Sequence, residues 1–360
     1  MEPQPIVSLK SRVERLGVTL ESDGSEYEIE GVLNPATART RDGRLLMYPR
    51  AVAHGNVSRI EIAEATDLGW KRIGFALEPS EPYEFRTVPG GYGCEDPRVT
   101  FVPLLDAYVM VYTAFGPSGP RVAIALSSDA YTWERLGLVD FSGLGAGDDK
   151  DGVFFPEPVI SPEGVRSFAF YHRPMDYVYL VDSRARVPLI LAKLPHEREC
   201  TRIAYVPVEA VLRDRNSLLR VTESVLVLDA SGSWGRIKNG AGTPPVRIDE
   251  GWLSLFHGVD AMYGRNGEFK GMRYSAGIVV HDLERPHIVR YRSPKPILLP
   301  EMGEERHGIV PHVVFPTGID QRSPHGRDYD VYYGMADSRI GRLRMQLGAS
   351  QLGAAAESAA

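Results

Sequence analysis

The sequence predicts an all-β fold, and three observations support this prediction. Short β-branched and aromatic runs, which are typical of strands, follow one another along the chain and are separated by turn signals. Five of these segments repeat a single plan. Helical patterning is scarce, with residues 13–17 and 208–215 as the best short candidates for helices.

Each repeated segment has a proline at its entry, a β-branched run, a turn, and then an aromatic-rich strand that ends in a polar residue. Turn signals such as Arg-Asp-Gly and Pro-Glu-Gly between the two runs predict β-hairpins. The segments are residues 34–50, 95–114, 155–173, 243–258 and 310–337. Their aromatic markers are Tyr48, Tyr112, Tyr171, Phe256 and Tyr333.

Further strands follow the hairpins in order. Residues 58–70 and 121–133 alternate apolar and polar side chains and end in Asp and then Trp, and residues 223–234 and 275–286 repeat this more loosely. Four strands per unit and five units predict a five-bladed β-propeller. A spacing wider than the roughly 40–50 residues of common blades leaves room for extra loops.

The alternatives are a large β-sandwich or two β-domains, but no Pro/Gly/Ser-rich linker divides the chain. We therefore expect one propeller domain over residues 31–345. An N-terminal segment, residues 1–30, would precede it, and residues 346–360 would form a flexible tail of small residues.

Composition narrows the class of protein. A net charge of −6 over 360 residues argues against a nucleic-acid partner. The only cysteines, Cys94 and Cys200, suggest reduced thiols and a cytoplasmic location. No apolar run approaches the roughly 20 residues that span a bilayer, so no membrane association is expected. The sequence leaves the oligomeric state open, a homo-oligomer included.

The ends of the five hairpins are the expected functional positions. In an antiparallel hairpin the start of the first strand lies beside the end of the second, so five such ends would meet at one mouth of a central channel. Polar side chains gather there, a mixture that fits a polyhydroxylated or phosphorylated ligand. They are Asn34, Arg50, Glu95, Asp96, Arg98, Thr113, Lys150, Asp151, His172, Arg173, Lys238, Thr243, His257, His312 and Asp337.

Each of these residues also has an ordinary structural explanation. An Asp before Pro commonly starts a turn, and a lone arginine or strand histidine is more often structural than functional. Their recurrence at equivalent ends is what favours a site. The chain has no Walker loop, no GxSxG elbow and no HExxH helix, which argues against a P-loop NTPase, a serine hydrolase and a zinc enzyme.

Several motifs in order resemble glycoside hydrolase family 130, the β-mannoside phosphorylases and related mannosidases. They are GCEDPR (93–98), KDGVFFPE (150–157), YHRP (171–174), GAGTPPV (240–246) with GWLSLFHGV (251–259), and YYGMADS (332–338). The resemblance covers residues 34–337. It implies a five-bladed propeller, which agrees with the count of repeats.

The resemblance also implies a reaction, the inverting phosphorolysis of a β-mannosidic bond to α-mannose 1-phosphate. Inorganic phosphate would be the co-substrate, with no other cofactor and no metal. Asp96 would donate the proton through the 3-hydroxyl of the bound mannose. Asn34, Arg50 and Asp337 would hold the mannosyl unit, and Arg173 and Lys238 the phosphate, with His172 and Tyr274 beside them. Among the other end residues, Glu95, Arg98, Lys150, Asp151 and His257 would line the sugar site.

Two alternatives stay open. Cations opposite Asp96 favour a phosphorylase, whereas a carboxylate there, with Glu157 or Asp151 as the base, favours an inverting β-mannosidase. The second alternative is a propeller that binds sugar without catalysis. The family's further arginine after the HRP segment has no clear match, and Arg184 or Arg186 would have to take its place.

Overall fold

The five predicted hairpins form the inner strands of five antiparallel blades, as the sheet pairings show. The computed structural model describes residues 5–141, 148–175 and 183–353. Blade 1 comprises β2 (Gly31–Arg39), β3 (Leu45–Ala53), β4 (Val57–Thr66) and β5 (Gly69–Leu77). Blade 2 comprises β6 (Tyr92–Val102), β7 (Ala107–Gly116), β8 (Gly119–Ser127) and β9 (Glu134–Leu138).

The remaining blades keep this order, with the first strand of blades 3 and 4 split in two. Blade 3 comprises β10 (Asp149–Phe154), β11 (Val159–Ile160), β12 (Arg166–Pro174), β13 (Thr201–Pro207) and β14 (Glu223–Leu228). Blade 4 comprises β15 (Lys238–Ala241), β16 (Val246–Ile248), β17 (Gly251–Tyr263), β18 (Phe269–His281) and β19 (Val289–Arg292). Blade 5 comprises β20 (Val314–Gln321), β21 (Asp328–Met335), β22 (Arg339–Leu352) and β1 (Ile6–Leu20).

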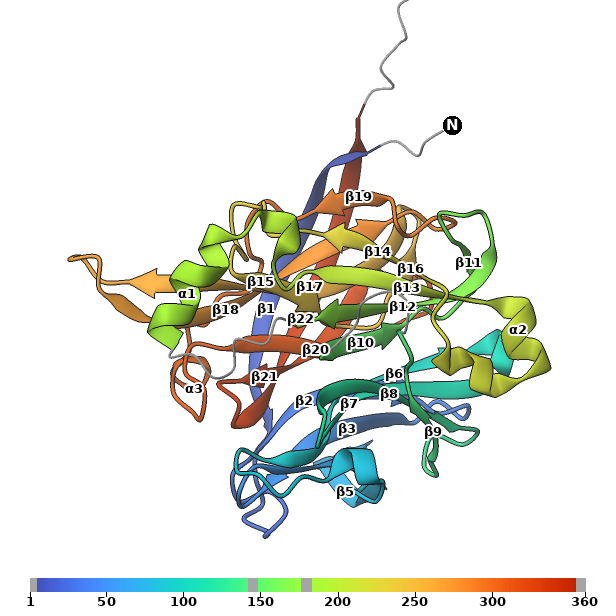
Figure 1. Cartoon of the computed structure of the whole chain (residues 1–360), viewed down its shortest axis with the longest axis horizontal. Coiled ribbons are helices and arrows are strands. Elements are labelled where there is room, and N and C mark those ends of the chain that lie inside the picture. The colour runs from blue at the N-terminus through green and yellow to red at the C-terminus, as the bar shows by residue number, and fades with distance from the viewer. Residues whose placement is uncertain (1–4, 142–147, 176–182, 354–360) are drawn as a thin grey trace, which may run out of the picture.

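The two ends of the chain meet in blade 5. β1 pairs antiparallel with β22 as the outermost strand, and Figure 1 shows the blue and red strands side by side. The N-terminal segment that we expected to precede the propeller therefore supplies one of its strands. β22 continues to Leu352, past the predicted start of the tail. The sequence pattern did not indicate β1, because much of this strand is exposed and charged.

The hydrophobic core lies between neighbouring blades, and it closes the ring. One cluster of buried side chains fills each of the five interfaces, which together join every blade to two others. Blade 5 also bonds to blade 1 directly, because the Thr317 hydroxyl donates to Pro35 O at 2.8 Å and the Thr37 hydroxyl to Ile319 O at 3.0 Å. This closure, and the 57% strand content, confirm the predicted all-β five-bladed propeller.

Helices are short and lie in the connections, as Figure 1 shows: α1 (Ser183–Ala192), α2 (Val208–Arg213) and α3 (Gly303–Arg306). The predicted helix at 208–215 is confirmed by α2. The one at 13–17 is wrong, because these residues lie within β1, where pairing with β22 overrides the local pattern. Among the described residues, no helix has both the length and the apolar character needed to cross a bilayer.

Candidate active site

The first strands of blades 1, 2 and 3 share one irregularity. Each contains a shift in register near its start, and one residue there has a positive φ: Asn34 (42°), Asp96 (46°) and Asp151 (58°). Asn and Asp tolerate this left-handed conformation better than most residues. Pro or Gly follows each of them. The Asp-Pro pair of the sequence thus marks a β-bulge, a device that re-aims a side chain.

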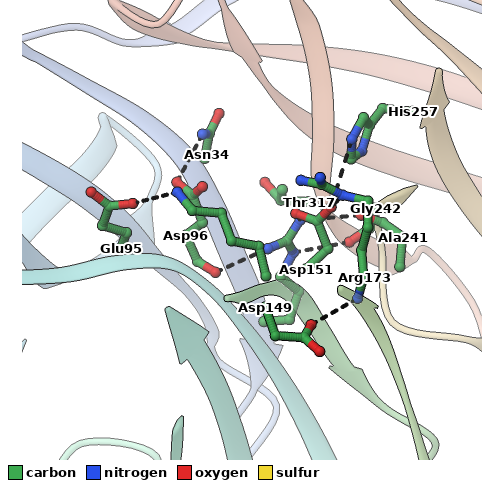
Figure 2. A network of polar contacts seen from close by, with 12 residues as sticks. Asn34, Glu95, Asp96, Asp149, Asp151, Arg173, Ala241, Gly242, His257 and Thr317 are labelled. Carbon is green, nitrogen blue, oxygen red and sulfur yellow. Dashed lines mark hydrogen bonds and ion pairs between the residues drawn. The ribbon is translucent and has the colours of Figure 1, made fainter. Parts of the chain in front are cut away.

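The three bulge residues line one cavity of about 280 Å³, which collects side chains from all five blades and from the chain that leads into blade 5. Asn34 and Asp96 lie to the left in Figure 2, and Asp151, Arg173 and His257 to the right. The lining residues are Asn34, Arg50, Asp96, Lys150, Asp151, Arg173, Met175, Lys238, His257, Tyr274, Val310, Val313, Phe315 and Asp337. The cavity thus contains ten of the residues singled out from the sequence.

Asp96 is held by two donors. Asn34 Nδ2 donates to Asp96 Oδ1 at 2.9 Å, and Arg50 Nη1 donates to the same oxygen at 3.1 Å. Burial raises the pKa of Asp96, but the charges of Arg50 and Lys150 outweigh burial and hold this pKa below its ordinary value. Asp96 is therefore ionised at neutral pH when the cavity holds no sugar.

Glu95 links the two cations on this side of the cavity. Its Oε1 accepts from Arg50 Nη2 at 3.0 Å, and its Oε2 accepts from Lys150 Nζ at 2.8 Å. Glu95 is buried and lies outside the cavity lining. Its contacts orient Arg50 and Lys150, which do reach the cavity.

Asp337 is the second carboxyl group near Asp96. Burial, followed by the negative charge of Asp96, raises the pKa of Asp337 to about 6. Asn34 Oδ1 is buried and has no hydrogen-bond partner among the described residues. It packs closely against the backbone of Gly334, where a side chain would not fit.

The opposite side of the cavity holds the two cations expected to bind phosphate. Arg173 Nε donates to Asp151 Oδ2 at 2.6 Å, and Arg173 Nη1 donates to Glu199 Oε2 at 2.8 Å. Lys238 Nζ lies 3.7 Å from the same oxygen of Glu199 and 5.5 Å from the centre of the Tyr274 ring. Both cations thus face carboxylates in the unliganded protein.

His257 adds no charge to this side. The ring is buried against Tyr274 and Phe315. Burial lowers the pKa of His257 to about 3. The negative charge of Asp151, whose Oδ2 lies 3.7 Å from Nε2, opposes this shift but does not outweigh it. Neither ring nitrogen forms a hydrogen bond within the described part of the chain. The ring is therefore neutral at pH 7.

Besides Glu95, two residues expected at the sugar or phosphate site lie outside the cavity lining, Arg98 and His172. Arg98 donates to Gly242 O and Ala241 O, both at 3.2 Å, so it ties blade 2 to blade 4 beneath the cavity. His172 Nδ1 is 2.6 Å from Asp149 Oδ2, and Asp149 Oδ1 accepts from the backbone N–H of Arg173 at 2.9 Å. Their contacts support the residues of the cavity.

The remaining candidates are placed as follows. Glu157, one of the two predicted bases, forms a half-exposed ion pair with Arg247 at 2.7 Å and does not line the cavity. The side chains of Arg184 and Arg186 lie outside the described residues. Sequence reasoning missed Glu199, which stands just before β13 in a run of charged residues and gave no signal of its own.

Comparison with known proteins assigns the chain to a family. The family model Glyco_hydro_130, described as β-1,4-mannooligosaccharide phosphorylase, matches residues 3–194 and 219–347. A 1,2-β-oligomannan phosphorylase from Thermoanaerobacter sp. (strain X514) is 29% identical over 328 residues, which are 88% of this chain and 90% of the relative.

Two solved structures share the fold. A β-1,2-mannobiose phosphorylase from Listeria innocua, in complex with β-1,2-mannobiose, matches with a TM-score of 0.68 at 20% identity, over 93% of this chain and 96% of that one. A structure from work on family members that hydrolyse β-1,2 mannosidic linkages in Candida mannan has a TM-score of 0.68 at 20% identity, over 94% and 95% of the chains. The family match spans most of the sequence, and the chain belongs to glycoside hydrolase family 130.

Proposed function

We propose that this protein is a β-mannoside phosphorylase, which transfers the mannosyl unit of a β-linked manno-oligosaccharide to inorganic phosphate with inversion. The observation that carries the proposal is the cavity itself. Asp96, Asn34 and Arg50 line one side of it, and Arg173 and Lys238 line the other. The phosphorylase names of the matched family and of the Thermoanaerobacter relative support the same reaction.

In the proposed reaction the glycosidic bond between the anomeric carbon and the leaving oxygen breaks. Asp96 supplies a proton through the mannose 3-hydroxyl to that oxygen, and a phosphate oxygen attacks the anomeric carbon from the opposite face. The products are α-mannose 1-phosphate and a shortened oligosaccharide. Asn34, Arg50 and Asp337 hold the mannosyl unit, and inorganic phosphate is the only other small molecule required.

Asp96 must be protonated for this step, although it is ionised in the unliganded cavity. Binding of a sugar removes water around the carboxylate, and a phosphate anion adds negative charge, and both effects favour the protonated form. Asp337 retains a proton up to about pH 6 and interacts with Asp96. The pair therefore offers a proton within the cavity itself.

Arg173 and Lys238 suit the phosphate for separate reasons. A guanidinium binds a phosphate through two parallel hydrogen bonds, and an ammonium acts as a point charge with three donors. Neutral His257 and the Tyr274 ring complete that side of the cavity. The arrangement holds an anion without requiring a metal.

One observation favours a second candidate, an inverting β-mannosidase. Asp151 lines the cavity beside Arg173, so a carboxylate as well as cations faces the sugar from this side. An inverting hydrolase uses a carboxylate roughly 6.5–9.5 Å from the acid to activate water. Asp151 would serve as that base.

Incubation of the purified protein with β-1,2- and β-1,4-linked mannobiose, with and without phosphate, tests the proposal. The expected result is phosphate-dependent formation of α-mannose 1-phosphate, measured by phosphorus NMR, from at least one of the two disaccharides. Release of free mannose at the same rate without phosphate would establish the hydrolase instead. Binding of both sugars without any product would indicate a non-catalytic propeller.

A further inference from the structure

We infer that Glu199 sets the affinity of the protein for phosphate, by occupying the anion's place between Arg173 and Lys238 until phosphate displaces it. This inference rests on the proposed phosphorolysis and adds to it a residue that determines specificity for the attacking group. It arises from the contacts that Glu199, which lies beside the cavity, makes with two residues of the cavity lining.

The position of the carboxylate supports the first part. Glu199 Oε2 accepts from Arg173 Nη1 at 2.8 Å and lies 3.7 Å from Lys238 Nζ. An oxygen of phosphate between the same two cations would need the same donors. The Glu199 side chain is only 2% exposed, so its contacts are made out of water, where they are strong.

The charges of the cluster support displacement. Asp151 and Glu199 face three cations, Arg98, Arg173 and Lys238, and His257 is neutral because burial lowers its pKa to about 3. Phosphate would bring up to two further negative charges into a buried cluster whose cations exceed its carboxylates by only one, which is costly unless a carboxylate leaves or is protonated. Asp151 is fixed by the bulge of β10 and by Arg98 and Arg173, so Glu199 is the carboxylate that can move.

The backbone around Glu199 limits this movement to the side chain. Asn239 N donates to Glu199 O at 3.1 Å, and Asn239 Oδ1 accepts from the Thr201 hydroxyl at 2.8 Å. Asn239 thereby joins the start of β13 to β15, next to Lys238. The loop that bears Glu199 stays in place while its side chain turns.

A second cavity offers the displaced carboxylate a destination. Glu199 borders a space of about 270 Å³ whose lining includes Lys193, Arg198 and Arg202. The Arg202 guanidinium donates to Ser224 Oγ and Ser224 O, both at 3.0 Å. A Glu199 carboxylate that rotated into this space would leave Arg173 and Lys238 and approach the cations of the second cavity.

The test compares Glu199→Gln with wild type, and uses Glu197→Gln as the matched control. Glu197 is exposed and lies two residues away on the same loop, where its Oε2 accepts from the backbone N–H of Leu194 at 2.9 Å. It also borders the second cavity, so this control shows whether charge in that space alone affects phosphate binding. Removing the competing charge should lower the KM for phosphate about tenfold. The kcat at saturating phosphate and the KM for the mannoside should stay within about twofold of wild type, because this charge competes with phosphate alone. The control should leave all three unchanged.

A binding measurement covers the case in which Glu199→Gln is inactive. Inorganic phosphate alone should raise the melting temperature of this variant more than that of wild type, and Glu199→Ala should behave in the same way. An unchanged or higher KM for phosphate, or an equal thermal shift, overturns the inference while phosphorolysis stands. A wild-type enzyme that turns over without phosphate and loses turnover in Glu199→Gln overturns both, because Glu199 would then be the base for water.

Discussion

The pKa values of Asp96 and Asp337, two carboxyl groups in one cavity, are shifted in opposite directions. Arg50 and Lys150 lower the pKa of Asp96 although burial opposes them, whereas burial and the charge of Asp96 raise the pKa of Asp337 to about 6. Divergent pKa values of this kind are typical of acid–base sites. The pair can therefore keep a proton near the reacting bond at slightly acidic pH.

Replacing Asp96 by Asn should abolish turnover, because the amide cannot release a proton to the sugar. We expect kcat/KM to fall by roughly 10³-fold or more, at the upper end of what general acids contribute. Initial rates with β-linked mannobiose and phosphate measure this loss. The melting temperature should change little, since Asn keeps the shape of the side chain and Glu95 still holds Arg50. A variant that keeps wild-type rates would remove Asp96 from its role as donor.

Asp337→Asn should stabilise the fold at the expense of activity. The pKa of Asp337 is raised in the folded state, so its contribution to stability is fully present below the unfolded pKa and is lost as pH rises through about 6. The variant avoids this loss. We expect a gain in the free energy of unfolding of about 1–2 kcal/mol at pH 7.5 and less at pH 4.5, after allowance for partial exposure.

Thermal unfolding at these two pH values checks the prediction for Asp337. Asp328→Asn, at the opposite end of β21, is the control. The same gain at both pH values, or a loss at pH 7.5, would show that Asp337 does not retain its proton in the folded protein.

At the scale of elements, β1 closes the ring through a partly buried ion pair as well as through strand pairing. Arg15 Nε donates to Glu305 Oε1 at 2.9 Å, and the hydroxyl of Tyr333 in β21 donates to the same oxygen at 2.9 Å. Glu305 is fully buried. Arg15 of β1 thus neutralises the Glu305 carboxylate, which also contacts β21 through Tyr333.

Arg15→Ala should destabilise the protein by about 2–3 kcal/mol, because it leaves the Glu305 carboxylate buried without its cation. Burial raises the pKa of Glu305, but Arg15 and backbone donors outweigh it, and the pKa is lowered. Such a group contributes stability above its unfolded pKa and loses it as pH falls through the folded pKa. The deficit should therefore shrink at low pH.

Urea unfolding at pH 7 and pH 4 measures the effect of Arg15→Ala. Arg12→Ala, an exposed position on the same strand, serves as the control and should cost less than about 0.5 kcal/mol. Equal losses in both variants would mean that β1 acts through strand pairing alone.

Some of these strands could be predicted from local sequence patterns and others could not. The hairpins were predictable because each combines a proline entry, a turn and an aromatic strand whose marker is buried, such as Tyr48 and Tyr333. β1 was not predictable, because its partner β22 lies at the other end of the chain. The pattern of charged residues in β1 is compatible with a helix as well as with an exposed outer strand.

At the scale of the whole molecule, radial repetition brings distant residues into one cavity. Recurrence at the hairpin ends was enough to predict that Asp96 and Lys238 would meet. It could not separate residues that face the cavity from those that brace it, as with Arg98, nor reveal Glu199. These distinctions depend on contacts between blades, which local sequence does not encode.

A crystal structure of the protein with mannose and phosphate bound is the most direct test of the account. We predict mannose in hydrogen-bond contact with Asp96 and Asn34, and phosphate on Arg173 and Lys238 beneath the opposite face of the ring. Phosphate bound elsewhere, or a mannose that contacts Asp96 with only a carboxylate and a water on its other face, would contradict phosphorolysis.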